Sequence, residues 1–387
     1  MFDVLTLNKI APQGLDKFDS AIYNVTDACE KPDGIILRSF SMHDMELPES
    51  LLAVARAGAG VNNIPIDACT DKGLVVFNTP GANANAVKEL VIAGLLLASR
   101  DIAGGIAWAK TLVGNGAEVP KMVEKGKGQF VGPEIKGKKL GVIGLGAIGV
   151  MVANTAKSLG MEVVGFDPYL TIDAAWHLSR SIHKAKDMNE IFATCDYITL
   201  HVPLNDSTKG MINEAAFKTM KNGVRILNFS RGGLVATADL ATAIESEKVA
   251  CYVTDFPDED VLKLPKTVCI PHLGASTPES EENCAEMAAH ELVDYLENGN
   301  ITNSVNFLSC SAEREGDARI TILHKNIPSM LSQFSALLAE KHINILNLTN
   351  KNKKENAYTI MDIEGEHPED LEEKLNAIEG VMRVRIL

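Results

Sequence analysis

The segment GVIGLGAIG, at positions 141–149, constrains the fold of this chain more than any other feature. It places Gly144, Gly146 and Gly149 directly after an apolar run and at the start of a helical pattern over 150–158. Glycines at this spacing allow a tight turn and a close approach of the backbone to a pyrophosphate, whose charge the amides of the helix N-terminus hold. The segment therefore predicts the strand, turn and helix of a dinucleotide-binding domain.

An acidic residue lies where such a domain needs one. Asp167 follows the next apolar run, VVGF at 163–166, and so stands at the end of the second predicted strand. A carboxylate at this position accepts hydrogen bonds from the adenosine ribose hydroxyls and repels a 2′-phosphate. We therefore expect NAD rather than NADP. The alternative, that the glycines serve only helix–strand packing, leaves the placement of Asp167 without a reason.

Short apolar runs alternate with helical patterns over most of the chain, which predicts an α/β fold with parallel sheets. The runs form two groups, separated by a helix predicted over 87–112, interrupted at Gly104 and Gly105, and by a loop or linker over 114–137. We expect two doubly wound parallel-sheet domains. Their predicted strands are 2–7, 34–37, 52–55 and 75–77 in the first group, and 139–143, 162–166, 197–201, 225–229, 251–255 and 267–270 in the second.

The C-terminal part of the chain shows a third pattern. After a helix predicted over 280–296 and a polar linker over 309–317, the order is strand, helix, strand, strand, helix, strand. That βαββαβ order predicts a ferredoxin-like sandwich. Its elements are predicted at 318–323, 329–341, 343–349, 357–363, 368–378 and 381–386.

The charge and the apolar content of the chain limit its partners. Acidic residues outnumber basic ones by 51 to 37, for a net charge of −14, whereas nucleic-acid binding needs a basic surface. The longest apolar run, 90–98, is far shorter than the ~18 residues of a membrane span. The N-terminus lacks the basic and then apolar pattern of a signal peptide. We therefore expect no nucleic-acid partner, no membrane and a cytoplasmic location.

The cysteines argue against a metal site. All 7 are scattered, with no spacing to one another or to histidine that would hold a metal ion. We expect no metal, and reduced cysteines that pack as small core residues. A catalytic thiol is the open alternative.

Three segments at the ends of later predicted strands carry polar residues that packing alone would not choose. ILNFSRGG contains Arg231 followed by two glycines, DFPDED holds a cluster of acids, and CIPHLGAST contains His272. An arginine fork suits a carboxylate, and an imidazole titrates near neutrality, which suits transfer of a hydroxyl proton. Because ligands bind at the strand C-termini of an open α/β sheet, these residues beside an NAD loop predict 2-hydroxy-acid chemistry.

Seven segments, in order along the chain, give it a resemblance to the D-2-hydroxyacid dehydrogenase family, and within it to phosphoglycerate-oxidising members with a C-terminal ACT domain. They are RAGAGVNNI, FNTPGANANAVKEL, GVIGLGAIG, DYITLHVPLNDSTKGMI, ILNFSRGGLV, CIPHLGASTPES and YLENGNITNSVNF. The resemblance implies NAD-linked oxidation of 3-phospho-D-glycerate, the entry to L-serine synthesis. It also implies a substrate-binding domain of residues 1–97 and 286–308, an NAD-binding domain of 98–285 and an ACT domain of 317–387.

The resemblance assigns roles to single residues. Arg231 resembles the catalytic arginine and His272 the acid–base histidine; we choose Glu259 as the carboxylate that supports His272, with Asp260 as the close alternative. The residues that resemble cofactor-binding positions are Gly144, Gly146, Ala147, Ile148, Gly149, Asp167, His201, Thr208, Asp255 and Gly274. Those that resemble positions near the substrate are Arg38, Ser39, Arg56 and Asn83.

The ACT-like segment implies regulation and assembly. His324, Asn326 and Asn344 match positions at which serine-inhibited relatives contact their effector, so L-serine is a candidate effector, although Ser329 stands where those relatives have glycine. We expect a homodimer or homotetramer. Two alternatives stay open. One is a dehydrogenase for another acid, such as glycerate, lactate or 2-hydroxyglutarate, and the other is an NAD-sensing binding protein like the family's corepressor branch.

Overall fold

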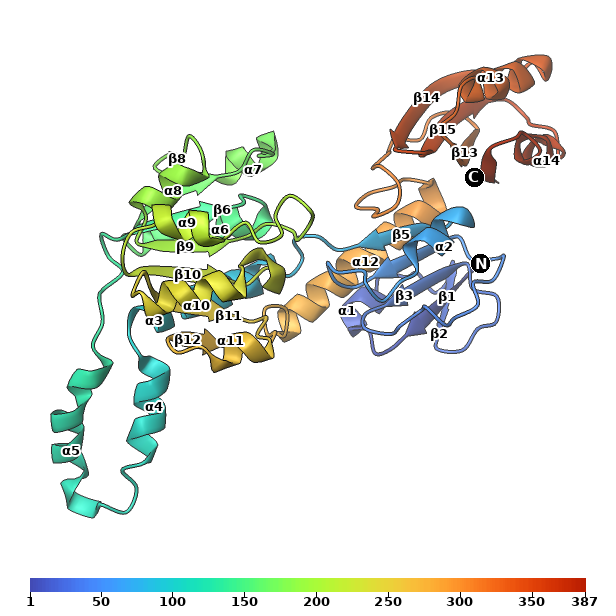
Figure 1. The fold of residues 1–387 in the computed structure, drawn as a ribbon. Helices are drawn as coiled ribbons and strands as arrows, with labels where there is room; N and C mark the ends of the chain where they lie inside the picture. The colour runs from blue at the N-terminus through green and yellow to red at the C-terminus, as the bar shows by residue number, and fades with distance from the viewer. The chain divides into compact units, whose positions relative to one another are not determined.

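The computed structural model describes residues 1–387, which form two compact units (Figure 1). Unit 1 comprises Met1–Asn83 and Pro278–Leu387, and unit 2 comprises Ala84–Thr277. The sequence places these boundaries at residues 98 and 285 instead. The first differs because helix α3 (Ala84–Ser99) packs along its length against unit 2, and the second because α12 (Pro278–Asn298) packs on the parallel sheet of unit 1.

Unit 2 is built on one parallel sheet in the order β12-β11-β10-β9-β6-β7-β8. This confirms a doubly wound sheet and all six predicted strands; only the polar two-residue edge strand β8 was not predicted. The strands are β6 (Lys139–Ile143), β7 (Glu162–Phe166), β8 (His183–Lys184), β9 (Tyr197–Leu200), β10 (Val224–Asn228), β11 (Val249–Thr254) and β12 (Thr267–Cys269).

Helices pack on this sheet, and α3 contacts β10 and β11. A Cβ at Gly94 would lie 2.6 Å from the Phe229 ring, so only glycine lets α3 pack this tightly on β10 and β11. The remaining helices are α6 (Ala147–Ser158), α7 (Ile172–His177), α8 (Met188–Thr194), α9 (Glu214–Thr219), η3 (Gly232–Leu234), α10 (Thr237–Glu245) and α11 (Glu259–Lys263).

The segment between α3 and β6 departs from two predictions. The helix predicted over 87–112 breaks at Arg100 rather than at the glycine pair, because the Asp101 side chain accepts the Gly104 N–H at 2.9 Å and so starts a new helix. The segment predicted as a linker is partly helical as well. The elements are α4 (Ile102–Lys110), η1 (Gly116–Glu118), α5 (Val119–Gly126) and η2 (Lys127–Phe130).

No helix by itself has both the length and the apolar content that a membrane crossing requires. Taken together, α3 and α4 reach both, but the pair bends by 72° at the break between them.

Unit 1 begins with a second parallel sheet, in the order β2-β1-β3-β4-β5. Its central strand is buried at all four residues, as expected where helices cover both faces. The short edge strand β2 was not predicted. The elements are β1 (Phe2–Leu7), α1 (Pro12–Leu15), β2 (Tyr23–Thr26), β3 (Gly34–Leu37), β4 (Ala53–Arg56), α2 (Ile66–Asp71) and β5 (Val75–Asn78), with α12 returning against the sheet.

The C-terminal module of unit 1 is an antiparallel sheet in the order β14-β15-β13-β16. The predicted βαββαβ order is confirmed. Apolar residues such as Ile320, Phe334 and Met361 form the core between one face of this sheet and its helices. The elements are β13 (Ala318–Lys325), α13 (Met330–Glu340), β14 (Asn344–Lys353), β15 (Asn356–Glu364), α14 (Leu371–Asn376) and β16 (Val381–Ile386).

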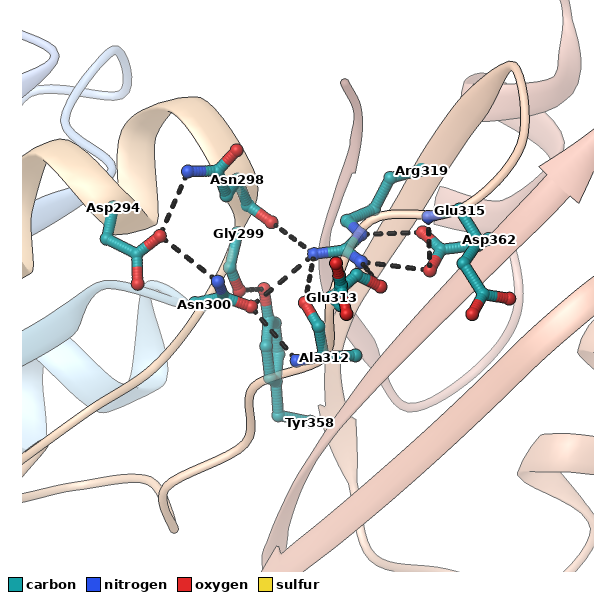
Figure 2. Close-up of polar contacts among 10 residues, drawn as sticks. All are labelled: Asp294, Asn298, Gly299, Asn300, Ala312, Glu313, Glu315, Arg319, Tyr358 and Asp362. Carbon is teal, nitrogen blue, oxygen red and sulfur yellow. Dashed lines mark hydrogen bonds and ion pairs between the residues drawn. The ribbon is translucent and has the colours of Figure 1, made fainter.

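The other face of this sheet packs against the end of α12 and the chain that follows it, and a buried arginine lies at their contact (Figure 2). Arg319, from β13, is fully buried and makes a two-bond ion pair with Asp362, at 2.6 Å and 2.9 Å. Its remaining N–H groups donate to the Asn298 carbonyl at 3.0 Å and to the carbonyls of two linker residues, Ala312 and Glu313. The charge of Arg319 is therefore matched on every side.

Two further side chains of this module bond to the carbonyls at the end of α12. The Tyr358 hydroxyl donates to the Gly299 carbonyl at 2.5 Å, as Figure 2 shows, and Arg385 donates to the Tyr295 carbonyl at 2.9 Å. The last carbonyls of a helix have no partner within it, so these donors end α12 and tie it to the C-terminal sheet.

Candidate active site

The parallel order of the strands in unit 2 brings its predicted site residues to one edge. All of these strands run in the same direction, so their C-terminal ends meet at the same edge of the sheet. The sheet order then places the residues side by side in two groups. From one side to the other they are His272 after β12, Asp255 after β11, Arg231 after β10, His201 after β9, Gly144 after β6 and Asp167 after β7.

The glycine turn has the shape that a pyrophosphate needs. Gly144 has φ +93°, and a Cβ there would lie 2.4 Å from the His201 carbonyl oxygen, so only glycine fits. A Cβ on Gly146 would meet nothing within 4 Å, which leaves open space in front of α6. Gly146 is also the N-cap of α6, and no side chain caps that helix, so the amides of Ala147 and Ile148 have no partner within it. Amides in this position suit an anion.

Asp167 is held at the end of β7 by two backbone amides. The Leu145 N–H donates to Oδ2 and the Tyr169 N–H to Oδ1, both at 2.8 Å. The carboxylate is half-buried beside the glycine turn, where it can still accept bonds from ribose hydroxyls. These residues therefore fit NAD.

His201 lies behind the glycine turn as a neutral imidazole. Its Nε2 is 3.0 Å from the Thr199 hydroxyl, and burial lowers the pKa of His201 to about 4. Its Nδ1 is buried and has no hydrogen-bond partner. Thr208, predicted at the same site, instead holds its own loop together: its hydroxyl donates to the Pro203 carbonyl at 2.6 Å.

Arg231 is exposed at the end of β10 and is oriented through its backbone. The buried Asn228 side chain donates to the Arg231 carbonyl at 2.8 Å, and the Asn228 Oδ1 accepts the Ser230 N–H at 3.2 Å. The guanidinium donates to the Ser230 carbonyl at 2.6 Å. Asn228 was not predicted; the available signal was an amide side chain at the end of an otherwise apolar strand.

Phe256 lies against both catalytic candidates. Its ring centroid is 4.5 Å from that of His272, and the Arg231 guanidinium carbon is 5.7 Å from the Phe256 ring centroid. The sequence did not single out this phenylalanine, because an aromatic residue after a strand is ordinary packing. The structure therefore brings Arg231 and His272 to the same side chain.

The structure does not bring Glu259 to His272. Glu259 begins α11, its side chain is 84% exposed, and it pairs with Lys263 at 2.8 Å, while Asp260 also pairs with Lys263. Asp255, which we assigned to the cofactor, follows β11, the strand beside the one that His272 follows. A Cβ added at Gly274 would lie 3.6 Å from the Asp255 Oδ2, so Gly274 and Asp255, both predicted to bind the cofactor, lie close together.

The predicted substrate residues of unit 1 share an edge as well. Arg38 follows β3 and Arg56 ends the neighbouring β4, so they lie at adjacent strand C-termini. Arg38 pairs with Glu281 of α12, and the Ser39 N–H donates to the Asn8 side chain at 3.2 Å. Asn83, half-buried, follows β5 in the turn before α3.

Thiol chemistry finds no support in the structure. All 7 cysteines are free and buried or half-buried, and burial raises the pKa of Cys69, Cys195, Cys251 and Cys310 to about 11. These thiols are therefore protonated and poor nucleophiles near neutral pH. No group of three or more acidic, histidine or cysteine side chains is arranged to hold a metal ion.

Comparison with known proteins decides the family. Residues 99–274 match the family model described as "D-isomer specific 2-hydroxyacid dehydrogenase, NAD binding domain". A D-3-phosphoglycerate dehydrogenase of Escherichia coli is 32% identical over 354 residues, which cover 88% of this chain and 82% of that protein. The chain belongs to the D-isomer-specific 2-hydroxyacid dehydrogenase family.

Two further relatives support this assignment. A D-3-phosphoglycerate dehydrogenase of Archaeoglobus fulgidus is 36% identical over 292 residues, which cover 72% of the present chain but only 52% of the archaeal protein. The present chain thus spans about half the length of that relative. The NAD⁺-bound crystal structure of a 3-phosphoglycerate dehydrogenase of Entamoeba histolytica superposes with a TM-score of 0.61 at 26% identity, covering 79% of this chain and 98% of that one.

The predicted effector residues of this dehydrogenase do not converge within one chain. His324 is buried, with Nε2 2.9 Å from the Thr359 hydroxyl, and Asn326 bonds to the Lys354 carbonyl at 3.1 Å. Asn344 pairs in register with the last residue of β15, at the opposite end of the sheet from His324. Ser329 has φ +69°, the left-handed conformation that glycine adopts without strain.

Proposed function

We propose that this dehydrogenase oxidises 3-phospho-D-glycerate to 3-phosphohydroxypyruvate with NAD, the first step of L-serine biosynthesis. The observation that carries the proposal is the order of strand ends in unit 2. An arginine, an acid and a histidine occupy three neighbouring strand ends, and the glycine turn and Asp167 occupy the other half of the same edge. The names of the relatives in Escherichia coli and Archaeoglobus fulgidus support the choice of substrate.

The residues divide the reaction between them. The His272 imidazole takes the proton of the C2 hydroxyl, while the Arg231 guanidinium holds the substrate carboxylate and polarises the C2 oxygen. NAD, when bound, supplies the acceptor for the hydride that leaves C2. The products are the 2-oxo acid, NADH and a proton that His272 passes to solvent. In the reverse direction, the protonated imidazole returns that proton to the oxygen.

Arg38 and Arg56 are the groups we propose for the phosphate. Both stand at strand C-termini of unit 1, and guanidinium forks bind phosphate with two parallel hydrogen bonds. A dehydrogenase for glycerate or lactate would not need two such cations, because neither acid has a second anionic group. They therefore favour a 2-hydroxy acid with a second anionic group, and the names of the relatives support the phosphorylated one.

The resemblance of the C-terminal module to an ACT domain supports further proposals on regulation and assembly. We infer that the C-terminal module is an ACT domain with L-serine as its effector, in which His324 and Asn326 of one copy meet Asn344 of a second. Their separation within one chain supports a site shared by two copies, and so a homodimer or homotetramer. We also infer a cytoplasmic enzyme without nucleic-acid or membrane partners.

One assay tests the function. NADH formation is followed with 3-phospho-D-glycerate, D-glycerate, D-lactate and D-2-hydroxyglutarate, each with and without L-serine. We expect the highest kcat/KM with the phosphorylated acid, and inhibition by serine. Equal rates with D-glycerate would favour the broader dehydrogenase, whereas tight NAD binding without turnover on any acid would favour an NAD-sensing protein.

A further inference from the structure

The loop that carries Arg38 is not fixed by burial alone. We call residues 38–42, which follow β3, the Arg38 loop. Met42 is fully buried, but Ser39 and Phe40 are exposed. The guanidinium of Arg38 pairs with Glu281, yet an ion pair at the surface orders a loop weakly, because water screens it. Other contacts must therefore fix the backbone of this loop.

Asn8 binds one side of the Arg38 loop. The last ladder pair of β1 and β3 joins the final residue of each strand, so Asn8 leaves the sheet beside the loop. Its Oδ1 accepts the Phe40 N–H at 2.7 Å and the Ser39 N–H at 3.2 Å. Asn8 has φ +76°, a left-handed conformation that asparagine tolerates better than most residues. Asn8 thus supplies an acceptor for two amides beyond the end of the ladder.

Asn63 binds the other side of the loop. It lies in the segment that follows β4, the strand on the opposite side of β3 from β1. Its Nδ2 donates to the Phe40 carbonyl at 2.7 Å and to the Arg38 carbonyl at 3.2 Å. Its own backbone carbonyl accepts the Met42 N–H at 2.8 Å. Segments from both neighbouring strands therefore bond to the Arg38 loop.

The two asparagines use opposite ends of the same amide group. The oxygen of Asn8 faces two N–H groups, whereas the NH2 group of Asn63 faces two carbonyls. Neither amide can be reversed, because donors would then face donors and acceptors would face acceptors. The Oδ1 of Asn63 is buried without a hydrogen-bond partner, which costs free energy. Stability alone would therefore not select an asparagine at position 63.

We propose that Asn8 and Asn63 are positioning residues for the substrate phosphate. They fix the backbone of the Arg38 loop from both sides, so the Arg38 guanidinium is already at the C-terminal edge of the unit 1 sheet when the substrate arrives. A group that is ordered beforehand loses less conformational entropy on binding. This proposal rests on the proposed function for the assignment of the phosphate to Arg38 and Arg56.

The test uses variants that remove one side of this support at a time. Asn8→Gly removes the acceptor and keeps the left-handed backbone, which glycine adopts without strain. Asn63→Leu removes both donors and keeps a side chain of similar size. The matched control is Asn24→Gly, which removes an exposed asparagine of the same sheet. Its side chain bonds to Asp3, at the other end of β1 from Asn8.

The first readout is hydrogen–deuterium exchange of a peptide that covers residues 38–42, measured by mass spectrometry on the full-length protein. We expect faster exchange in Asn8→Gly, because two amides lose their acceptor, and in Asn63→Leu, because the loop loses its second support. Asn8→Asp keeps an acceptor and should exchange as the wild type does. Asn63→Asp has no donor and should exchange like Asn63→Leu. Asn24→Gly should leave this peptide unchanged.

The second readout compares kcat/KM for 3-phospho-D-glycerate and for D-glycerate. In Asn8→Gly and Asn63→Leu, we expect the value for the phosphorylated acid to fall about tenfold, while the value for D-glycerate stays near that of the wild type. The dissociation constant of 3-phospho-D-glycerate, measured by calorimetric titration, should rise by the same factor. A residue with a merely structural role would lower kcat/KM for both acids alike.

Other outcomes overturn the proposal. If exchange becomes faster but the affinity for 3-phospho-D-glycerate is unchanged, the asparagines serve stability alone. Unchanged exchange in both variants would show that they do not fix the loop, and an equal effect of Asn24→Gly would show a general loss of stability. If Asn63→Leu does not fold, the variants of the exposed Asn8 are subject to the same criteria.

The proposed function can fail separately. A wild type that binds 3-phospho-D-glycerate but oxidises no 2-hydroxy acid would refute the proposed function, while the exchange rates and the affinities would still decide this proposal. A wild type that does not bind 3-phospho-D-glycerate would overturn both.

Discussion

Two buried aspartates show opposite uses of the same chemistry. In the C-terminal module, Asp362 receives two hydrogen bonds from Arg319, whose other N–H groups all reach carbonyls. At the catalytic edge of unit 2, Asp255 also faces an arginine, yet its Oδ1 has no donor and the guanidinium of Arg231 is exposed. One pair is complete and the other is not.

The difference separates a structural charge from a functional one. A satisfied ion pair fixes the parts that it joins, and removing one partner strands the other. An unsatisfied carboxylate beside exposed cations leaves hydrogen-bonding capacity for a ligand or for a proton in transfer. Glu291, on α12, is the intermediate case: it is buried, its Oε1 accepts a bond from Asn303, and its Oε2 has no partner.

The largest effect is expected at the catalytic edge. His272→Asn should lower kcat by about 10²- to 10⁴-fold, because the proton acceptor is lost, while NADH affinity and thermal stability stay near those of the wild type. Steady-state kinetics and an NADH fluorescence titration measure these quantities. Full activity of this variant would show that the edge does not carry the chemistry.

Breaking the buried Arg319–Asp362 ion pair should lower the stability of the protein. Arg319→Met should lower the free energy of unfolding by about 3–5 kcal/mol, because Asp362 is left buried and uncompensated. The double variant Arg319→Met/Asp362→Leu should recover at least half of that loss. The matched control is Lys374→Met, which breaks an ion pair with Asp370 at the surface and should change the free energy of unfolding far less, because water screens such a pair. Chemical denaturation measures all three, and equal losses in the two single variants would contradict this interpretation.

Glu291 should make stability depend on pH. Burial raises the pKa of Glu291 to about 8, well above its value in the unfolded chain, so the unfolded state loses this proton first as pH rises. The free energy of unfolding should therefore fall between about pH 4.5 and pH 8 and then level. Glu291→Gln should be more stable than the wild type at pH 8, by roughly 3–4 kcal/mol, and similar to it at pH 5.

A glutamine at Glu286 is the control for that experiment, since Glu286 is a half-exposed glutamate of the same helix. Glu286→Gln should leave the difference in the free energy of unfolding between pH 5 and pH 8 as it is in the wild type. If Glu291→Gln behaves in the same way, the buried carboxyl is not protonated in the folded protein.

The smallest effect concerns the substrate edge of unit 1. Glu281→Gln releases Arg38 from its half-exposed ion pair with Glu281. Such a pair contributes about 1 kcal/mol at most. Because Arg38 is then available to the phosphate, we expect KM for 3-phospho-D-glycerate to fall by up to about fivefold. KM for D-glycerate, which has no phosphate, should stay unchanged. An equal change for both acids would show that Arg38 does not meet the phosphate.

Local patterns sufficed to predict most of the fold. The glycine turn, the buried strands and the C-terminal βαββαβ order all rest on periodicities within single segments, and the structure confirms them. The errors lie where one side chain overrides a pattern. Asp101 caps a new helix and so moves the break away from the glycine pair; an acid three residues before Gly104 was the available signal.

Pairings across long stretches of chain could not be predicted. Arg319 and Asp362 are 43 residues apart, and each looks like a single charge within an apolar strand; only the register of β13 and β15 joins them. The choice between Glu259 and Asp260 as the carboxylate partner of His272 stayed open for the same reason. Both follow β11 closely, and which one faces His272 depends on the register with β12 and on the start of α11.

The most direct test of the account follows the hydrogen that leaves the substrate. The protein is given NAD and 3-phospho-D-glycerate that carries deuterium at C2, and the NADH is analysed by mass spectrometry. We predict that one deuterium atom appears in the nicotinamide ring, with 3-phosphohydroxypyruvate formed in equal amount, and that His272→Asn greatly slows this transfer. NADH without deuterium, or none at all, would contradict hydride transfer at this edge.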